Sequence, residues 1–310
     1  MKKFAFICPG QGSHSVGMLN MFSDLDIVRY TIQEASDTLN IDIWKLIADG
    51  PPDKLNMSIN TQPSILTASI ACQRAWIYAG GTIPSIIAGH SLGEYTALVM
   101  ADALKFCDAL RLVRFRAKAM QTAVPPGKGG MAAILGLNDN VVCMVCKEAS
   151  QVGVVEAVNF NAPKQIVIAG HNLAVKNACK IAKAKGARSV ILPVSVPFHS
   201  SLMKPVLDKL RNYFAGVDIQ IPKIAVVNNI DVESPSDPVA IKDALIRQVS
   251  GPVHWIDCVR YIANTGVTHM IECGPGRVLT GLIKRIDSKL ESLSISDPES
   301  ISKAINLISS

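Results

Sequence analysis

Residues 89–93, Gly-His-Ser-Leu-Gly, have the types and spacing of a nucleophilic site. They follow a short apolar run at 84–88 and precede residues 94–100, whose Ala, Leu, Val and Met content favours a helix. A serine in such a tight strand-to-helix turn is lifted clear of the sheet, and the two glycines let neighbouring backbone pass close to it. Ser91 is therefore a candidate nucleophile, although glycine-rich turns of this kind also occur without a catalytic role.

A serine hydroxyl reacts readily only when a base removes its proton, and His199 is the histidine best placed to be that base. It follows a strand broken at Pro197 and precedes a helix predicted at 203–214, which puts it in a loop rather than in the core. His90 is expected to point away from Ser91 in the tight turn. The histidines left outside this pairing are His14, His90, His171, and the two expected to be structural, His254 and His269.

The helix predicted over 104–123 carries an arginine close to its apolar side. This side is formed by Leu110, Val113, Ala117 and Met120, and the opposite side carries the solvated cations Arg111, Arg114 and Lys118. At about 100° per residue, Arg116 falls roughly 60° from the centre of the apolar side. An unpaired buried guanidinium is costly, so Arg116 must meet an anion or reach water. A structural ion pair and a clamp for a substrate carboxylate both fit this pattern.

A glycine-rich turn at 9–13, Pro-Gly-Gln-Gly-Ser, ends the strand predicted at 3–8. Backbone N–H groups in such a turn can face an anion or a developing oxyanion. A plain turn is the favoured interpretation of these residues when no second motif supports an anion site. The motif alone therefore assigns no function to Gln11.

The segment after the Pro- and Gly-rich residues 125–130 shows a separate alternation of predicted strands and helices. It predicts strands at 131–135, 154–159, 165–169 and 189–192 and helices at 138–149 and 173–185. The order β-α-β-β-α-β is that of a ferredoxin-like unit. We therefore expect an α/β protein with a small domain, 125–196, inserted into a large domain made of 1–124 and 197–310. Residues 159–163, on the predicted connection between the two central strands, could meet a ligand through side-chain amides, and a simple Asx turn fits them as well.

The remaining elements are predicted from apolar runs and helix boundary signals. A long apolar helix is expected to begin at Gln62-Pro63-Ser64 and run through Tyr78, because Pro and Ser suit a helix start. Strands are expected at 223–228 and 268–273, a helix ending at 245–248, an amphipathic helix after Gly274-Pro275-Gly276, and a terminal helix at 298–308.

Composition narrows the class of protein. The 310 residues are 49% hydrophobic, which allows a large core, and the net charge of +6 is too diffuse for nucleic-acid binding but suits an anionic substrate or an acidic partner. No run approaches the roughly 18 apolar residues of a membrane span, and the run at 4–8 is shorter than the roughly 7 of a signal peptide. We expect a globular cytoplasmic protein.

The eight cysteines are sparse and irregularly spaced, which indicates free thiols rather than a disulfide scaffold. Cys143 and Cys146 form a Cys-x-x-Cys, but they lie in a helix-like run with no second pair or nearby histidine. No metal site and no cofactor are therefore predicted.

Seven ordered motifs together resemble those of the malonyl-CoA:acyl carrier protein transacylases of fatty-acid synthesis, across essentially the whole chain. The motifs are Pro9-Gly10-Gln11-Gly12-Ser13, Gly89-His90-Ser91-Leu92-Gly93-Glu94-Tyr95, Arg116 with Met120-Gln121, Asn159-Phe160-Asn161, Pro197-Phe198-His199-Ser200 to Met203, Gln248 with Pro252-Val253-x-Trp255, and Glu272-x-Gly274-Pro275-Gly276. The resemblance implies an α/β-hydrolase-like large domain with a parallel sheet and an inserted ferredoxin-like domain. Two departures from the usual pattern, Ala117 and His254, touch no functional role.

The resemblance also implies a role for each site residue. Ser91 would be the acyl acceptor, His199 its general base, and the backbone carbonyl of Gln248 the group that orients His199. The backbone N–H groups of Gln11 and Leu92 would form the oxyanion hole. The substrate-binding residues would be Arg116, for the malonyl carboxylate, and His90 and Asn159 as supporting contacts.

The activity implied is transfer of a malonyl group from malonyl-CoA to the phosphopantetheine thiol of acyl carrier protein, through an ester on Ser91. These two are the expected partners, and a monomer is expected. An acyltransferase that loads polyketide carrier domains would share the motifs. An α/β-hydrolase esterase is a weaker alternative, because no acid is obvious between Ser91 and His199 in the Ser-Asp-His order, and intact Ser91 and His199 argue against a catalytically dead carrier-binding module.

Overall fold

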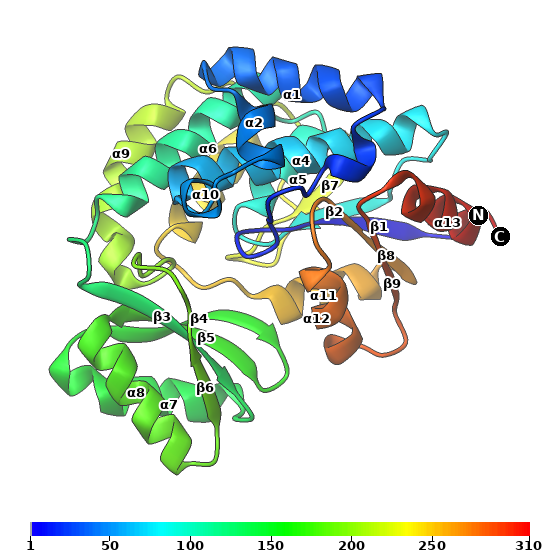
Figure 1. Cartoon of the computed structure of the whole chain (residues 1–310). Coiled ribbons are helices and arrows are strands. Elements are labelled where there is room, and N and C mark those ends of the chain that lie inside the picture. The colour runs from blue at the N-terminus through cyan, green and yellow to red at the C-terminus, as the bar shows by residue number, and fades with distance from the viewer. Residues whose placement is uncertain (1) are drawn as a thin grey trace.

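A five-stranded parallel sheet organises most of the chain in the computed structural model, which describes residues 2–310 (Figure 1). Its strand order is β7 (Ala225–Val227), β2 (Ile86–Gly89), β1 (Phe4–Cys8), β8 (His269–Cys273) and β9 (Glu291–Ile295). All four strand pairs are parallel. The central strand β1 is a continuous apolar run because helices cover both faces of the sheet.

The two faces of β1 belong to different parts of the core. Phe4, Phe6 and Cys8 pack with the large helical layer, whereas Ala5 and Ile7 pack with the smaller one. The large layer contains α1 (Asp26–Leu39), α2 (Ile43–Ala48), α4 (Ser58–Tyr78), α5 (Gly93–Met100), α6 (Phe106–Gln121), α9 (Lys204–Phe214) and α10 (Pro238–Gln248). The short helix α3 (Pro52–Leu55) packs against α2 and α4. The smaller layer contains α11 (Trp255–Asn264) and α12 (Val278–Ile286).

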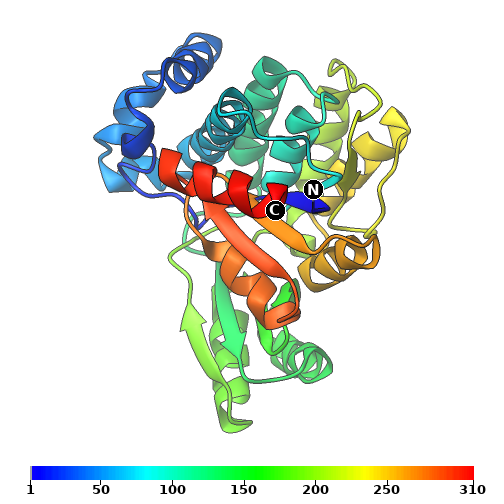
Figure 2. The ribbon, with the colours of Figure 1, turned by 90° about the vertical axis from the view of Figure 1, so that its right-hand side faces the viewer.

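The last helix, α13 (Pro298–Ser309), brings the two ends of the chain together (Figure 2). The backbone N–H of Lys2 donates to the carbonyl of Ile308 at 2.8 Å. Three short 3-10 turns complete the helical segments of residues 2–310, at Asn20–Phe22, Ser150–Val152 and Ser201–Met203.

A separate four-stranded sheet is formed by the middle of the chain. Its elements are β3 (Gly129–Leu135), α7 (Asp139–Ala149), β4 (Val155–Ala162), β5 (Gln165–His171), α8 (Asn172–Ala184) and β6 (Arg188–Ile191). The strands are antiparallel in the order β4-β5-β3-β6, and α7 and α8 cover the face turned away from the rest of the chain (Figure 1). The predicted element order β-α-β-β-α-β is thus confirmed.

Three details differ from the sequence-based predictions. Helix α4 begins at Ser58, before the predicted start, and contains Pro63. The helix tolerates this proline because it removes only one backbone hydrogen bond near the first turn, and the following turns are buried. Strand β4 extends through Ala162, so residues 159–162 lie on a strand rather than on a connection. The predictions also missed β9 and α11, the latter starting at Trp255.

Strand β1 crosses so close to the start of α5 that only glycine fits at Gly93. A Cβ there would lie 2.1 Å from the carbonyl oxygen of Cys8, which belongs to the central strand and cannot move. We expect Gly93→Ala to lower the free energy of unfolding by about 3 kcal/mol in urea denaturation. Gly281→Ala is the matched control, because Gly281 lies in α12 with no atom within 4 Å of the added methyl group and should gain about 0.5–1 kcal/mol. Equal stabilities of the two variants would contradict the steric argument.

Candidate active site

Ser91 lies in the turn between β2 and α5, as the sequence predicted. Its backbone is left-handed, with φ of 52°, a conformation that costs free energy for a residue with a side chain and is typical of a nucleophile turn. The turn is held closed by the N–H of Gly93, which donates to the carbonyl of His90 at 2.9 Å, and a Cβ on Gly89 would collide with Gly93. Gly89 is therefore required by the turn itself, whereas Gly93 is required by the close approach of β1.

His199 contacts Ser91 directly. Its Nε2 lies 2.7 Å from Ser91 Oγ, and its Nδ1 lies 2.8 Å from the backbone carbonyl of Gln248. A carbonyl can only accept, so Nδ1 carries the ring proton and Nε2 is left free to accept the serine proton. The geometry is that of a serine paired with a base that a carbonyl orients.

The surroundings keep His199 neutral. Burial lowers its pKa to about 3, with a further contribution from the nearby positive charge of Arg116. The hydrogen bond to Gln248 acts in the opposite direction but is the weaker effect. The imidazole is thus in its base form throughout the neutral range.

Arg116 is almost fully buried, at 1% exposure, and its hydrogen-bond partners are all neutral. Its guanidinium donates to Gln62 Oε1 at 3.0 Å, to Gln248 Oε1 at 3.1 Å and to Ser91 Oγ at 3.2 Å. Within residues 2–310 it forms no direct ion pair, and it lies 5.4 Å from the centre of the Tyr95 ring. A buried cation without an anionic partner, beside the nucleophile, is suited to bind a substrate carboxylate.

A cavity of about 400 Å³ opens in front of Ser91, a size ordinary for a small-molecule site. Of the predicted site residues, those that line it are Gln11, His90, Ser91, Arg116, Asn159 and His199. Gln248 and Leu92 do not line it, and their expected contributions are backbone groups. Across residues 2–310, no acceptor is found for the backbone N–H of either Gln11 or Leu92, as an oxyanion hole requires before substrate binds.

Strand β4 of the antiparallel sheet forms one wall of this site. Its Asn161 Oδ1 lies 2.8 Å from Nε2 of His90, and Asn159 Oδ1 is buried without a hydrogen-bond partner among residues 2–310. The strand is attached to the parallel-sheet part through Val253, whose backbone bonds to Val158 and Phe160. The asparagines therefore reach the site from a rigid strand rather than from a flexible loop.

The sequence-based argument missed three polar side chains that hold the site. Asn229 accepts from the N–H of Ser91 at 2.6 Å and donates to the carbonyl of Gly89 at 2.7 Å. Gln62 bonds to both Arg116 and Gln11, and Glu94 bonds to Gln248 and Asn229. Asn229 could have been found, because it follows strand β7, and parallel neighbours end at the same edge of a sheet.

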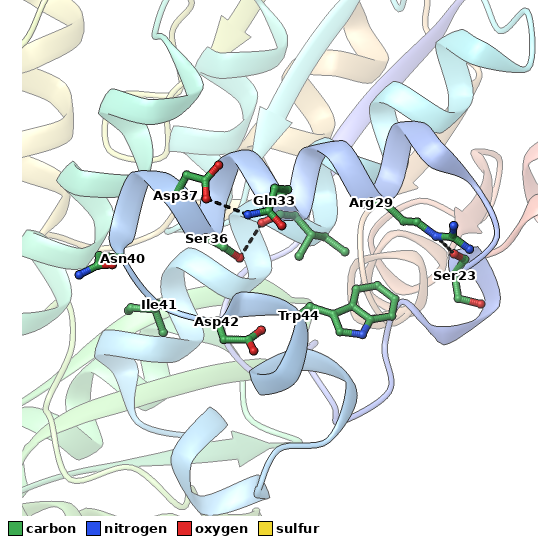
Figure 3. A pocket seen from close by; sticks show the side chains of 10 residues that line it. Ser23, Arg29, Gln33, Ser36, Asp37, Asn40, Ile41, Asp42 and Trp44 are labelled. Atoms are coloured by element: carbon green, nitrogen blue, oxygen red, sulfur yellow. Dashed lines mark hydrogen bonds between the residues drawn. The ribbon is translucent and has the colours of Figure 1, made fainter.

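A second hollow, of about 730 Å³, lies between α1 and α2 and shares no lining residue with the first (Figure 3). Its polar groups bond to one another: Arg29 donates to the carbonyl of Ser23, and Gln33 donates to Asp37. Among residues 2–310, no three His, Cys, Asp or Glu side chains lie close enough to hold a metal ion. Nor does any helix in that range have the length and apolarity to cross a membrane.

Comparison with known proteins decides the family. Residues 5–298 match the family described as acyl transferase domain. The malonyl CoA-acyl carrier protein transacylase of Salmonella typhimurium is 50% identical over 307 residues, covering 98% of this chain and 99% of the relative. This chain belongs to the malonyl-CoA:acyl carrier protein transacylases.

Solved structures of transacylases superpose on nearly the whole chain. The acyl-carrier-protein S-malonyltransferase of Burkholderia pseudomallei is 66% identical, with a TM-score of 0.97 over 98% of this chain and 99% of that one. A malonyl-transacylase in complex with its type II polyketide acyl carrier protein is 46% identical, with a TM-score of 0.97 over 99% and 100%. The family resemblance inferred from the seven motifs is confirmed.

Burial of neutral His199 should make the stability of this transacylase depend on pH. Because the folded-state pKa lies below the ordinary value of 6.5, stability is present above pH 6.5 and is lost as pH falls toward 3. Between pH 7 and pH 5 we expect this residue to cost the protein about 2 kcal/mol of unfolding free energy. In urea denaturation, the unfolding free energy that His199→Gln loses between pH 7 and pH 5 should be smaller than the wild-type loss by that amount. Equal losses in the two proteins would contradict a buried neutral imidazole.

Proposed function

We propose that this chain transfers a malonyl group from malonyl-CoA to the phosphopantetheine thiol of acyl carrier protein, as an [acyl-carrier-protein] S-malonyltransferase of fatty-acid synthesis. One observation carries the proposal: Ser91 Oγ lies 2.7 Å from a base, His199, and 3.2 Å from a buried cation, Arg116. A nucleophile, its base and a carboxylate-binding group thus meet in one cavity. The relatives named malonyl-CoA transacylases support the same activity.

The first half-reaction forms an ester on Ser91. His199 Nε2 takes the hydroxyl proton while Ser91 Oγ attacks the thioester carbonyl of malonyl-CoA. The backbone N–H groups of Gln11 and Leu92 stabilise the oxyanion of the tetrahedral intermediate. As that intermediate collapses, the carbon–sulfur bond breaks, and the thiolate of CoA takes the proton from His199.

The second half-reaction repeats these steps with a different thiol. The phosphopantetheine thiol of the carrier protein gives its proton to His199 and attacks the ester carbonyl, and Ser91 leaves with that proton. Because CoA departs before the carrier acts, the kinetics are ping-pong. The carbonyl of Gln248 keeps Nδ1 protonated during both steps and takes the place of a triad acid.

The malonyl carboxylate is bound by Arg116, whose guanidinium turns from Ser91 Oγ to the carboxylate once the ester forms. Fork-shaped guanidinium groups bind carboxylates through two parallel hydrogen bonds. His90 and Asn159 line the same cavity, and we assign them supporting contacts to the acyl chain. The chemistry needs no metal and no cofactor in this scheme.

We also propose the domain boundaries and partners. An α/β-hydrolase-like large domain comprises 1–124 and 197–310, and a ferredoxin-like small domain comprises 125–196, an assignment supported by the strand order β4-β5-β3-β6. The chain acts as a monomer that meets its carrier protein transiently, and free cysteines suit the reducing cytoplasm. A carrier protein of polyketide synthesis is the alternative acceptor, since one relative is solved with such a partner.

The acyl-enzyme is the first test of this function. After addition of malonyl-CoA, intact-mass spectrometry should show one malonyl group on the wild-type chain and none on Ser91→Ala. The ester should disappear when carrier protein bearing phosphopantetheine is added. Labelling that survives Ser91→Ala would remove Ser91 from the mechanism, and rapid hydrolysis without transfer would favour an esterase.

The second test concerns the choice of acyl group. Arg116→Ala should lower kcat/KM for malonyl-CoA relative to acetyl-CoA by more than about a hundredfold, because losing one partner of a buried charge pair costs about 3–5 kcal/mol. Arg116→Lys keeps the charge without the planar fork, so its preference for malonyl-CoA over acetyl-CoA should lie between those of the wild type and Arg116→Ala. An unchanged preference for malonyl-CoA in Arg116→Ala would return Arg116 to a structural role.

A further inference from the structure

Glu94 is a buried carboxyl group beside the nucleophile with no task in the reaction described above. It lies in the first turn of α5 and is 2% exposed. Its Oε2 accepts hydrogen bonds from the backbone N–H of Asn229 at 2.9 Å and from Nε2 of Gln248 at 2.8 Å. Burial raises the pKa of Glu94 to about 7, whereas these two bonds and the charge of Arg116 lower it. A group so costly to bury calls for a physical reason.

The Gln248 side chain connects this carboxyl group to Arg116. Its Nε2 also donates to the carbonyl of Ser91 at 3.1 Å, and its Oε1 accepts from Nη2 of Arg116 at 3.1 Å. An amide has donors on one side and an acceptor on the other. If the amide were reversed, its NH2 group would face the guanidinium, donor against donor.

An acceptor at Oε2 of Glu94 removes that ambiguity, because it holds the NH2 end of Gln248 and turns the oxygen toward Arg116. We propose that Glu94 is a positioning residue for substrate selection, which orients the Gln248 amide and thereby the guanidinium that receives the malonyl carboxylate. This inference rests on the proposed function. Gln248 then has two separate tasks, since its backbone carbonyl orients His199 and its side chain orients Arg116.

The indirect arrangement has a chemical advantage over an ion pair. A carboxylate in direct contact with Arg116 would occupy the guanidinium fork and compete with the malonyl carboxylate. A neutral amide between the carboxyl group and the guanidinium fixes the guanidinium but leaves it without an anionic partner. Gln62 does the same on the other side, accepting from Nη1 of Arg116 at 3.0 Å. Two neutral amide oxygens thus hold the fork, with Ser91 Oγ as its third partner until the substrate arrives.

The test removes the acceptor and then restores it. Glu94→Met, which has similar length but no acceptor, should lower the malonyl-over-acetyl ratio of kcat/KM by about tenfold, chiefly by raising KM for malonyl-CoA, as expected for one lost hydrogen bond to a charged group. Glu94→Gln keeps a carbonyl oxygen at the position of Oε2 and should stay within about twofold of wild type. Glu272→Met is the matched control, because Glu272 is equally buried but caps α12 through Leu279 and Thr280.

A double-mutant cycle shows whether Glu94 acts through Gln248. Gln248→Met removes the amide but keeps the backbone carbonyl, and adding Glu94→Met to it should cause no further loss of the ratio. The proposal is overturned if Glu94→Met keeps the wild-type ratio, or if Glu94→Gln loses as much as Glu94→Met. If Glu94→Met does not fold, an unchanged ratio in Gln248→Met overturns it. A wild-type chain that forms no malonyl ester would instead contradict the proposed function.

Discussion

The buried positive charge of Arg116 is the constraint to which the rest of the site responds. A guanidinium at 1% exposure has lost most of its hydration, and only neutral oxygens replace the water. A buried guanidinium without an anionic partner beside the serine is what distinguishes this site from that of an ordinary serine hydrolase. The same charge helps to lower the pKa of His199, so it also keeps the base ready to accept a proton. In the proposed mechanism, substrate selection and base chemistry are therefore coupled through one side chain.

The parallel sheet brings the parts of this site to one edge. Strands β1, β2 and β7 are neighbours, and each is followed at its carboxyl end by a site segment: the turn at 9–13, the Ser91 turn, and Asn229. Parallel strands end at the same edge, so segments that are far apart in the sequence lie side by side there. The hydrogen bond from the N–H of Ser91 to Asn229 joins the segments that follow β2 and β7.

The antiparallel unit forms one wall of the cavity and also contacts the two segments that carry Ser91 and His199. Asn161 contacts His90, and the carboxylate of Glu156 accepts from the N–H of Ser201, two residues after His199, at 2.6 Å. Strand β4 thus touches both the segment that carries Ser91 and the segment that carries His199. Because a strand is stiffer than a loop, it can hold these two segments at a constant separation, on which the 2.7 Å contact between Ser91 and His199 depends.

The sequence by itself determined the strand-to-helix turn around Ser91, the loop position of His199, the inward placement of Arg116 and the element order of the antiparallel unit. Each of these follows from local periodicity or from the φ angles that Gly and Pro allow. The sequence left open whether Arg116 meets an acid, and it did not show that Gln62, Glu94 and Asn229 would bond to the site residues. Only the tertiary structure decided those points, because a buried hydrogen-bond network depends on which side chains from distant segments lie within about 3 Å of each other. A local sequence pattern does not show which side chains from distant segments come into contact.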